Sequence, residues 1–324
     1  MLHDELAAAA HAHGGYLLTR HLLRLGFSQR RISSLTRAGV LVRPRHGTYV
    51  PRGLWELSDR FARHAILTRS VLERADGDAV ATHQSAAAVL GLDLWGVDLS
   101  RIHLARTDRR TGRHIAGVVW HEPLLAEADV SDASGVRTVT PALAALQVAS
   151  LSGIEQGVVT LSAVLRSGGL SDGELDDHVG RFRSWAGADG VRHAANLADG
   201  RLETVGEARS FVMFWRHGID LPDLQVVIID VHGRAIGRVD FEWTLDRHVG
   251  EFDGLIKYGR LNPFSSDPGL NLVLEKTRED DVRDTRRGCS RWGWVDLAPP
   301  RQAATVARIE AARARSRRLY VSAA

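Results

Sequence analysis

The sequence of 324 residues contains a single cysteine, Cys289. One cysteine cannot form an internal disulfide framework or a cysteine-based zinc site, which agrees with a reducing compartment. No apolar run approaches the roughly 20 residues that a membrane helix needs, and the start MLHDEL lacks the basic residues and apolar stretch of a signal peptide. We therefore expect a cytoplasmic protein with no membrane association.

Several motifs that cradle phosphates or activate a serine are also missing. The sequence has no P-loop, no GxGxxG after a predicted strand and no GxSxG elbow. The whole sequence is 44% hydrophobic and 25% charged, which is the composition of a globular protein and not of a disordered one. The length favours two or three domains.

The basic charge is concentrated at one end of the chain. Residues 1 to 60 contain nine arginines against four acidic residues, a balance of +5, whereas the whole chain carries only +3. Such a concentration indicates an acidic partner, and nucleic acid is the usual one. A basic surface that is merely solvated remains the alternative.

The first 53 residues divide into short predicted elements. Helices are expected over 2–12, over 20–25 and, after the cap residue Ser28, up to Ala38. The stretch LVRPRHGTYV at 41–50 reads as two strands around a turn. Three helices followed by a hairpin predict a winged helix-turn-helix over residues 1–53.

In a winged helix the third helix enters the major groove and the wing meets the phosphate backbone. A winged helix that contacts protein instead of DNA is the competing interpretation. If the winged helix binds DNA, the predicted contacts are Gln29, Arg30, Ser33, Ser34 and Arg37 on the third helix and Arg43, Arg45 and His46 on the wing.

Residues 54–200 read as an α/β middle domain. Helices are expected over 83–91 and from 140 onward, and strands over 101–106 and 117–121. The loop between these strands carries three arginines, which we interpret as a solvated hairpin tip. The histidines of this region show no regular metal-ligand spacing, so we interpret them as surface or satisfied core residues: His83, His103, His114 and His121.

Acidic residues recur in residues 201–300. A helix over 203–217 carries Glu207 at the edge of its apolar arc, and strands are predicted over 224–230, 235–241 and 248–254. Side chains alternate along a strand, so Glu251 shares a face with Asp253. Carboxylates converging from a helix and two strands suit Mg²⁺. We expect Asp240, Glu251 and Glu207 to hold the ion and Asp253 to complete the site.

Basic residues follow the acids. Lys257 comes directly after the turn at Gly254 and could neutralise charge on a phosphate, and Lys276, on a predicted charged helix at 275–283, is a second candidate. A closing strand is predicted over 292–297 and a basic helix over 301–324. For each acid taken alone, a solvated strand end or a surface ion pair is the competing interpretation.

Two family resemblances rest on these residues. Glu207 on a helix, then GRVDF at 237–241 and GEFDG at 250–254 with KYG after it, resemble the PD-(D/E)xK nuclease superfamily, in particular its very-short-patch-repair-like branch. The stretch from GYLLTRHLLRLGFS to GTYV resembles the winged helix of AbiEi-type antitoxins of type IV toxin–antitoxin systems. One departure concerns the superfamily lysine, because its position holds Asp253.

The resemblances imply an α/β multidomain protein: a winged helix-turn-helix, an antitoxin-like middle domain and a restriction-endonuclease-like α/β domain. The leading hypothesis is a Mg²⁺-dependent endonuclease that the winged helix positions on double-stranded DNA. The alternative is an antitoxin-like transcriptional regulator whose nuclease fold has lost catalysis. A third hypothesis is a module that neutralises a cognate toxin protein, with the basic C-terminal helix around Val306 and Ile309 as its docking element. The favoured interpretation of this helix is that it packs against its own domain or lies on the surface.

Overall fold

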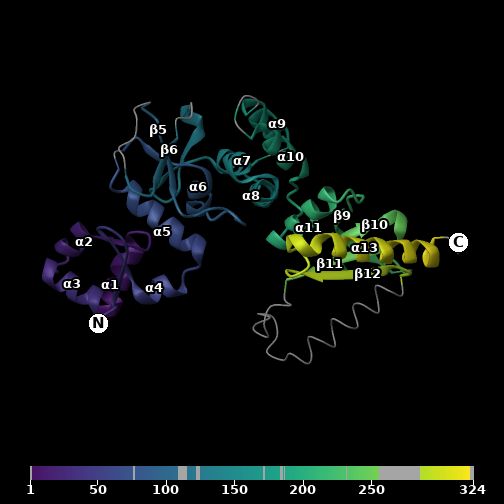
Figure 1. Cartoon of the computed structure of the whole chain (residues 1–324), viewed down its shortest axis with the longest axis horizontal. Helices are drawn as coiled ribbons and strands as arrows, with labels where there is room; N and C mark the ends of the chain where they lie inside the picture. The colour runs from purple at the N-terminus through teal and green to yellow at the C-terminus, as the bar shows by residue number, and fades with distance from the viewer. Residues whose placement is uncertain are drawn as a thin grey trace. The chain divides into compact units, whose positions relative to one another are not determined.

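A computed structural model describes residues 2–75, 77–108, 115–121, 125–170, 172–182, 185, 187–230, 232–254 and 285–321 (Figure 1). The chain forms two compact units. The first contains residues 1–164 and 168–195, and the second contains residues 165–167 and 196–324. Both mix helices with sheets, which confirms the α/β class in its broad form.

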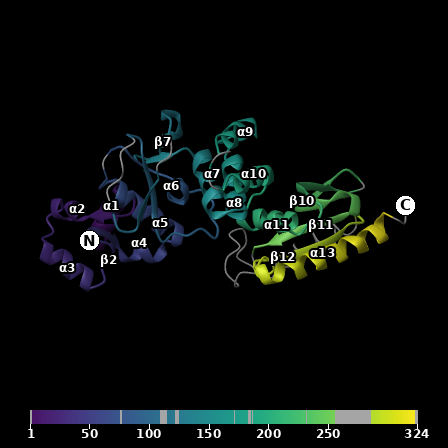
Figure 2. The same ribbon diagram turned by 45° about the horizontal axis from the view of Figure 1, so that its top comes forward.

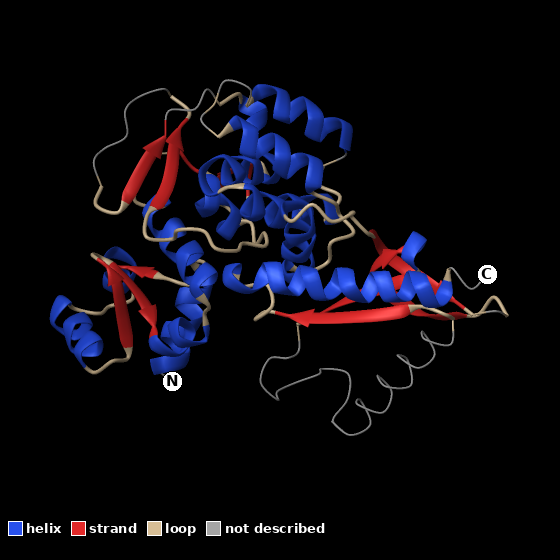
Figure 3. Ribbon diagram, turned by 45° about the vertical axis from the view of Figure 1, so that its right-hand side comes forward, coloured by secondary structure: helices blue, strands red, loops and turns tan. Residues whose placement is uncertain are grey.

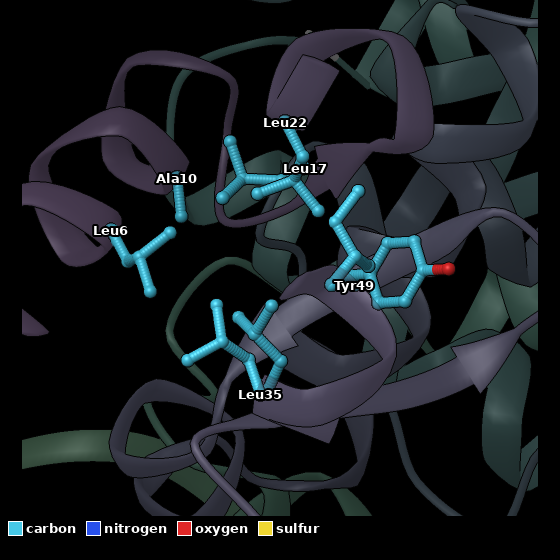
Figure 4. Close-up of a cluster of buried hydrophobic side chains, with 8 residues drawn as sticks. Leu6, Ala10, Leu17, Leu22, Leu35 and Tyr49 are labelled. Carbon is cyan, nitrogen blue, oxygen red and sulfur yellow. The ribbon is translucent and has the colours of Figure 1, made fainter. Parts of the chain in front are cut away.

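The first unit begins with three helices and a hairpin, as the sequence predicts. The elements are α1 (Leu2–Ala12), β1 (Leu17–Leu18), α2 (Thr19–Arg24), α3 (Gln29–Arg37), β2 (Leu41–Arg45) and β3 (Thr48–Pro51). The strands form a sheet of order β1-β3-β2. Aliphatic side chains from all three helices meet at its face around Leu6, Leu22 and Leu35 (Figure 4). This arrangement is consistent with a winged helix.

Local sequence explains where α3 begins and how it is oriented. Ser28 precedes it in an extended conformation, and its hydroxyl accepts a hydrogen bond from the Arg31 N–H at 3.2 Å. Ile32 and Leu35 are buried in the core cluster. Because these two residues bind one face of α3 to the core, the opposite face points to solvent.

The middle of the first unit is built on a five-stranded sheet of order β6-β5-β4-β8-β7. The strands are β4 (Ala79–Ala81), β5 (Ile102–Arg106), β6 (Val118–His121), β7 (Val130–Asp132) and β8 (Arg137–Val139). Strand β5 pairs with β6 in parallel and with β4 antiparallel. The helices are α4 (Arg52–Leu57), α5 (Arg60–Leu72), α6 (His83–Val89), α7 (Pro141–Ser152), α8 (Ile154–Arg166), α9 (Asp172–Arg181) and α10 (Ala188–Leu197), with the short 3-10 helix η1 (Glu127–Asp129).

The second unit consists of α11 (Val205–Arg216), β9 (Asp223–Ile229), β10 (Ala235–Trp243), the 3-10 helix η2 (Thr244–Asp246), β11 (His248–Asp253), β12 (Gly288–Gly293) and α13 (Pro299–Tyr320). Its sheet has the order β12-β11-β10-β9. Strands β9, β10 and β11 form an antiparallel meander, and β12 runs parallel to β11. Helix α13 runs along the sheet and contacts β12 and β11 (Figures 2 and 3).

Aromatic rings form the core of the second unit. Phe214 of α11 packs edge-on against Phe241, Trp243 and Trp292 of the sheet, with ring centroids 5.3 to 5.5 Å apart. Gly206 lies so close to Phe252 that an added Cβ would come within 1.9 Å of the ring. This close approach fixes the N-terminal end of α11, and with it Glu207, against β11.

One prediction about the end of the chain needs correction. The closing strand predicted over 292–297 is β12 at Gly288–Gly293, and a turn follows in which the Gly293 N–H donates to Asp296 at 2.9 Å. The basic C-terminal helix packs against its own unit, which is the favoured interpretation of the sequence. Val306 and Ile309 are buried, since α13 packs on its own sheet.

Several predicted features lie outside the described residues. They are Lys257, Lys276, the helix at 275–283, the loop arginines Arg109, Arg110 and Arg113, and His114. Within the described part of the chain, the helices are too short or too polar to cross a bilayer.

Candidate DNA interface, acidic residues and a histidine cluster

The solvent face of α3 carries the predicted base-reading side chains. Gln29, Arg30, Ser33 and Arg37 are exposed, and Ser34 is half-buried. Ser33 and Arg37 follow Arg30 by about one and two helical turns, so these side chains lie on one face. Within the helix, the Arg37 Nε donates only a long hydrogen bond of 3.4 Å to the Ser33 carbonyl. The face therefore offers polar and cationic groups at the spacing that a groove-reading helix needs.

Two of the predicted wing residues are exposed to solvent, and the third contacts another part of the first unit. Arg43 and His46 are exposed, and an Arg43 guanidinium nitrogen lies 2.6 Å from the His46 Nδ1. Arg45 is oriented differently from the expectation, because its guanidinium donates to the Ala116 carbonyl beside β6. Desolvation lowers the pKa of this guanidinium. Arg43 and His46 are thus the exposed wing residues, and their contact with a phosphate backbone stays a prediction.

Glu207 is buried at the first turn of α11, but backbone and side-chain donors already hold its carboxylate. Its oxygens accept hydrogen bonds from the Thr204 hydroxyl at 2.7 Å, the Glu203 N–H at 2.9 Å and the Gln225 amide at 2.8 Å. In return the Thr204 hydroxyl accepts from the Glu207 N–H. Burial raises the pKa of this carboxyl group. The arrangement resembles a capping box and stabilises the start of the helix.

Asp240 and Glu251 occupy matching positions on neighbouring strands. The β10–β11 pairing includes Phe241 opposite Gly250, so the next step in this register sets Asp240 opposite Glu251. Residues opposite each other in an antiparallel pair have their side chains on the same face. The Asp240 carboxylate accepts the Phe252 N–H at 2.8 Å. Glu251 forms an ion pair of 2.9 Å with Arg291, its register partner on β12.

These acids do not form a three-carboxylate metal site as they are placed. In the part of the chain that the structure describes, no set of three ligand atoms within 4.8 Å of one another includes Glu207, Asp240 or Glu251. An arginine already neutralises Glu251, and three donors hold Glu207. Asp253 ends β11, in the position of the superfamily lysine. The three acids thus do not converge on one ion in this arrangement, and their ligand roles stay predictions.

Comparison with known families identifies the N-terminal part. Residues 4–52 match the family model described as transcriptional regulator, AbiEi antitoxin. This AbiEi segment runs from α1 through β3, so it contains the whole candidate DNA interface. The acids of the second unit lie outside it.

Two relatives from Mycobacterium tuberculosis are similar to a larger part of the chain. They are the uncharacterized protein MT2308 of strain CDC 1551 and the uncharacterized protein Rv2248 of strain H37Rv. Each is 31% identical over 179 residues, which is 55% of this chain and 64% of the relative. The similarity therefore extends beyond the AbiEi segment, and it spans less than two thirds of the relatives' own length.

Outside the AbiEi segment, three histidines lie close together that the sequence analysis did not interpret as metal ligands. His83 begins α6, His103 lies on β5 and His121 ends β6, and one ring nitrogen from each lies within 4.8 Å of the others. The interpretation of His83 as satisfied is wrong, because its Nδ1 is buried and has no hydrogen-bond partner. Burial lowers the pKa of His83 to about 2 and that of His103 to about 4.

The sequence held a signal for part of this cluster. The parallel register of β5 and β6 pairs His103 with Val119 and Ala105 with His121. His103 and His121 therefore point to the same side of the sheet, two residues apart along it. The approach of His83 depends on how α6 packs against the sheet, and no local pattern predicts that.

Proposed function

We propose that this protein is a DNA-binding transcriptional regulator of the AbiEi antitoxin type. The observation that carries the proposal is the exposed face of α3, with Gln29, Arg30, Ser33 and Arg37, inside the segment that matches the AbiEi model. Guanidinium groups read guanine edges by paired hydrogen bonds, and the amide of glutamine pairs with adenine. The wing residues Arg43 and His46 add backbone contacts that position the helix.

The proposal is tested by measuring DNA affinity of the full-length chain. A duplex from upstream of the protein's own gene is compared with an unrelated duplex of equal length, by fluorescence anisotropy at several salt concentrations. Arg30→Ala should weaken binding to the preferred duplex by roughly 10- to 100-fold, since a lost base contact is worth about 1–3 kcal/mol. Arg43→Ala should weaken both duplexes alike and lower the salt slope by about one.

Arg318→Ala is the matched control, because Arg318 is an exposed arginine on α13, outside the AbiEi segment. Its DNA affinity should equal that of the wild type. If Arg30→Ala and Arg43→Ala leave both affinity and salt dependence unchanged, the winged helix does not read DNA. In that case it binds protein.

The antitoxin description also suggests a partner toxin. The apolar face of α13 packs on its own sheet, so a toxin would meet other surfaces of the chain. Co-expression of the adjacent genes followed by co-purification tests this partner, and the absence of a stable complex would contradict it.

A second candidate function is the metal-dependent DNA cleavage that the nuclease resemblance implies. One observation favours it: the meander β9-β10-β11 followed by a parallel β12, with Asp240 and Glu251 at matching positions. The partners of Glu207 and Glu251 weigh against it. The test is incubation of plasmid with Mg²⁺ and protein, beside Asp240→Ala and Glu251→Ala variants. Equal products from wild type and variants, or no products, would remove this function.

A further inference from the structure

We propose that His83, His103 and His121 form a binding site for a transition metal ion, with Zn²⁺ as the preferred ion. One ring nitrogen from each residue lies within 4.8 Å of the other two. Three imidazoles brought together from separate elements are the donor set of many zinc sites, which keep a fourth position for water or another ligand. The inference is independent of DNA binding, since these histidines lie outside the AbiEi segment.

The fold holds the three rings together at a conformational cost. His83 has a φ of 53°, in the left-handed region that residues with a side chain rarely adopt. This conformation turns its ring toward the sheet, where it stacks on His121 with centroids 3.9 Å apart. Strained backbone persists where the surrounding structure imposes it, and it is concentrated at functional sites.

Unpartnered polar atoms surround the cluster. His83 Nδ1 is buried without a hydrogen-bond partner, and so are Gln84 Oε1, Gln147 Nε2 and Thr82 Oγ1. His83 is only 5% exposed. A buried polar atom without a partner costs about 1–3 kcal/mol, and proteins carry few of them. Four at one place indicate a ligand, and a metal ion would take the lone pair of His83 directly.

The donor chemistry selects the class of metal. Neutral imidazole nitrogens favour zinc, copper, nickel and iron, whereas Mg²⁺ and Ca²⁺ require oxygen ligands. A neutral imidazole is the form that binds a metal. No carboxylate belongs to this set.

Metal binding would require the rings to rotate, because His83 stacks on His121 at an interplanar angle of 23° and an imidazole nitrogen binds a metal in the plane of its own ring. His103 Nδ1 and His121 Nε2 are 2.8 Å apart and share a proton. Two nitrogens bound to one tetrahedral zinc at about 2.0–2.1 Å lie roughly 3.4 Å apart. The rings must therefore separate by about half an ångström, and the proton between them must move to the other nitrogen of its own ring, so that both rings stay neutral.

Gln84 would orient one of the ligands. Its side-chain amide nitrogen lies 2.9 Å from His103 Nε2 and donates to the Asp98 carbonyl, while its Oε1 has no partner. When His103 binds through Nδ1, its Nε2 carries the proton. Rotation of the Gln84 amide would then let Oε1 accept that proton, as the acceptors behind zinc-bound histidines do. The Asp98 carbonyl would lose the hydrogen bond from Gln84 and accept one from water instead, because Asp98 is exposed.

A second group of potential ligands is less suited to a cation. His13, His21 and Glu73 also lie within 4.8 Å of one another. However, Glu73 accepts a hydrogen bond of 2.6 Å from the Tyr16 hydroxyl and pairs with Arg20 and His21. A guanidinium already supplies the positive charge there. This group therefore serves as an internal comparison.

The experiment uses the full-length chain without a polyhistidine tag. Zinc content after purification is measured by mass spectrometry, zinc affinity by competition with a chromophoric chelator, and coordination by the visible spectrum of the Co²⁺-loaded protein. We expect one ion per chain and cobalt bands of a four-coordinate site. His121→Ala, at the half-buried end of β6, should lower affinity by at least about 100-fold.

Two further variants make the result decisive. His232→Ala, an exposed histidine of the second unit, should leave affinity and spectrum unchanged. His13→Ala should also leave them unchanged, because it belongs to the other histidine group. His103→Gln repeats the test at a second ligand, and circular dichroism verifies that each variant is folded.

The proposal is overturned by a wild-type chain that takes up no zinc or cobalt from solution. It is equally overturned if a folded His121→Ala variant binds as tightly as the wild type, or if His13→Ala removes the ion. Loss of binding in His121→Ala and His103→Gln, with retention in both histidine controls, establishes the site.

Discussion

Two clusters of buried polar groups, one in each unit, differ in how their groups find partners. In the second unit Asp246, only 1% exposed, receives Arg313 at 2.7 Å and Arg317 at 2.6 Å, and buried His248 binds Ser290 and Ser316 at 2.9 Å each. Around α6 of the first unit, four buried polar atoms have no partner. Satisfied groups of the first kind hold a fold together, whereas unsatisfied groups require a separate explanation.

The difference changes where chemistry is expected. The sequence directs attention to the acids of the second unit, but there Glu207 and Glu251 are engaged by donors and by an arginine. The histidines of the first unit attract little attention in the sequence, yet His83 has a buried ring nitrogen without a hydrogen-bond partner. Residue type alone does not decide where chemistry is expected, because that also depends on which partners the fold supplies.

The largest expected effect concerns the Asp246 network. In the Asp246→Ala variant Arg313, which is 7% exposed, stays a buried charge. Among the described residues, the ion-pair partner that it keeps is the exposed Asp220 at 3.2 Å. Loss of one member of a buried ion pair costs about 3–5 kcal/mol of unfolding free energy. Hydrogen exchange of β11 and α13, measured peptide by peptide, should show this loss of protection within the second unit.

A surface pair in the first unit gives the matched control. Asp189→Ala removes an exposed partner of Arg192, and such pairs contribute about 0–1 kcal/mol. A loss in Asp246→Ala no larger than in Asp189→Ala would show that the buried network does not stabilise the second unit, and the contrast between the units would fail.

The next effect is the pH dependence that His248 gives to the second unit. Burial lowers the pKa of His248 to about 4, from about 6.5 in an unfolded chain. The unfolded state therefore binds the proton first, so stability is complete above about pH 6.5 and falls as the pH drops toward 4. The complete loss is about 3 to 4 kcal/mol. His248→Gln should flatten this part of the curve in denaturant titrations followed by hydrogen exchange, and an unchanged slope would contradict the assignment.

Local signals in the sequence predicted the AbiEi segment well. Ser28 caps α3 as expected, Gly39 ends it in a left-handed conformation, and the hairpin lies where the Pro and Gly turn sets it. Each of these features is determined by a few residues that are neighbours in the sequence. For the same reason Asp59, whose carboxylate accepts the Phe61 and Ala62 N–H groups at the start of α5, was a readable signal that the sequence interpretation did not use.

Non-local features were harder to predict. The WGWVDL pattern suggested a strand over 292–297, but pairing with β11 fixes the strand at 288–293. The two acids on β10 and β11 were placed correctly on strands, whereas the partner of Glu251 depended on the register with β12. The histidine cluster depends on the packing of a helix against a sheet. In each case the deciding contact joins residues far apart in the sequence.

The smallest effect comes from one chemical change made at two helix caps. Thr204 precedes α11, and its hydroxyl bonds both the Glu207 N–H and the Glu207 carboxylate. Thr82 precedes α6, is fully buried and has no partner for its hydroxyl. Thr204→Val should therefore cost about 0.5–2 kcal/mol, and Thr82→Val should be neutral or stabilising by up to about 1 kcal/mol, because it removes an unsatisfied group and keeps the shape.

Both changes are measured as differences in unfolding free energy of the unit that contains them, by hydrogen exchange in zinc-free buffer. Valine suits the extended conformation of both positions, with φ values of −136° at Thr82 and −128° at Thr204, so backbone strain does not confuse the comparison. An equal cost at the two caps would mean that the Thr82 hydroxyl has a partner after all, such as a buried water. The polar atoms around His83 would then need no ligand to explain them, and the contrast between the two units would reduce to a difference in hydration.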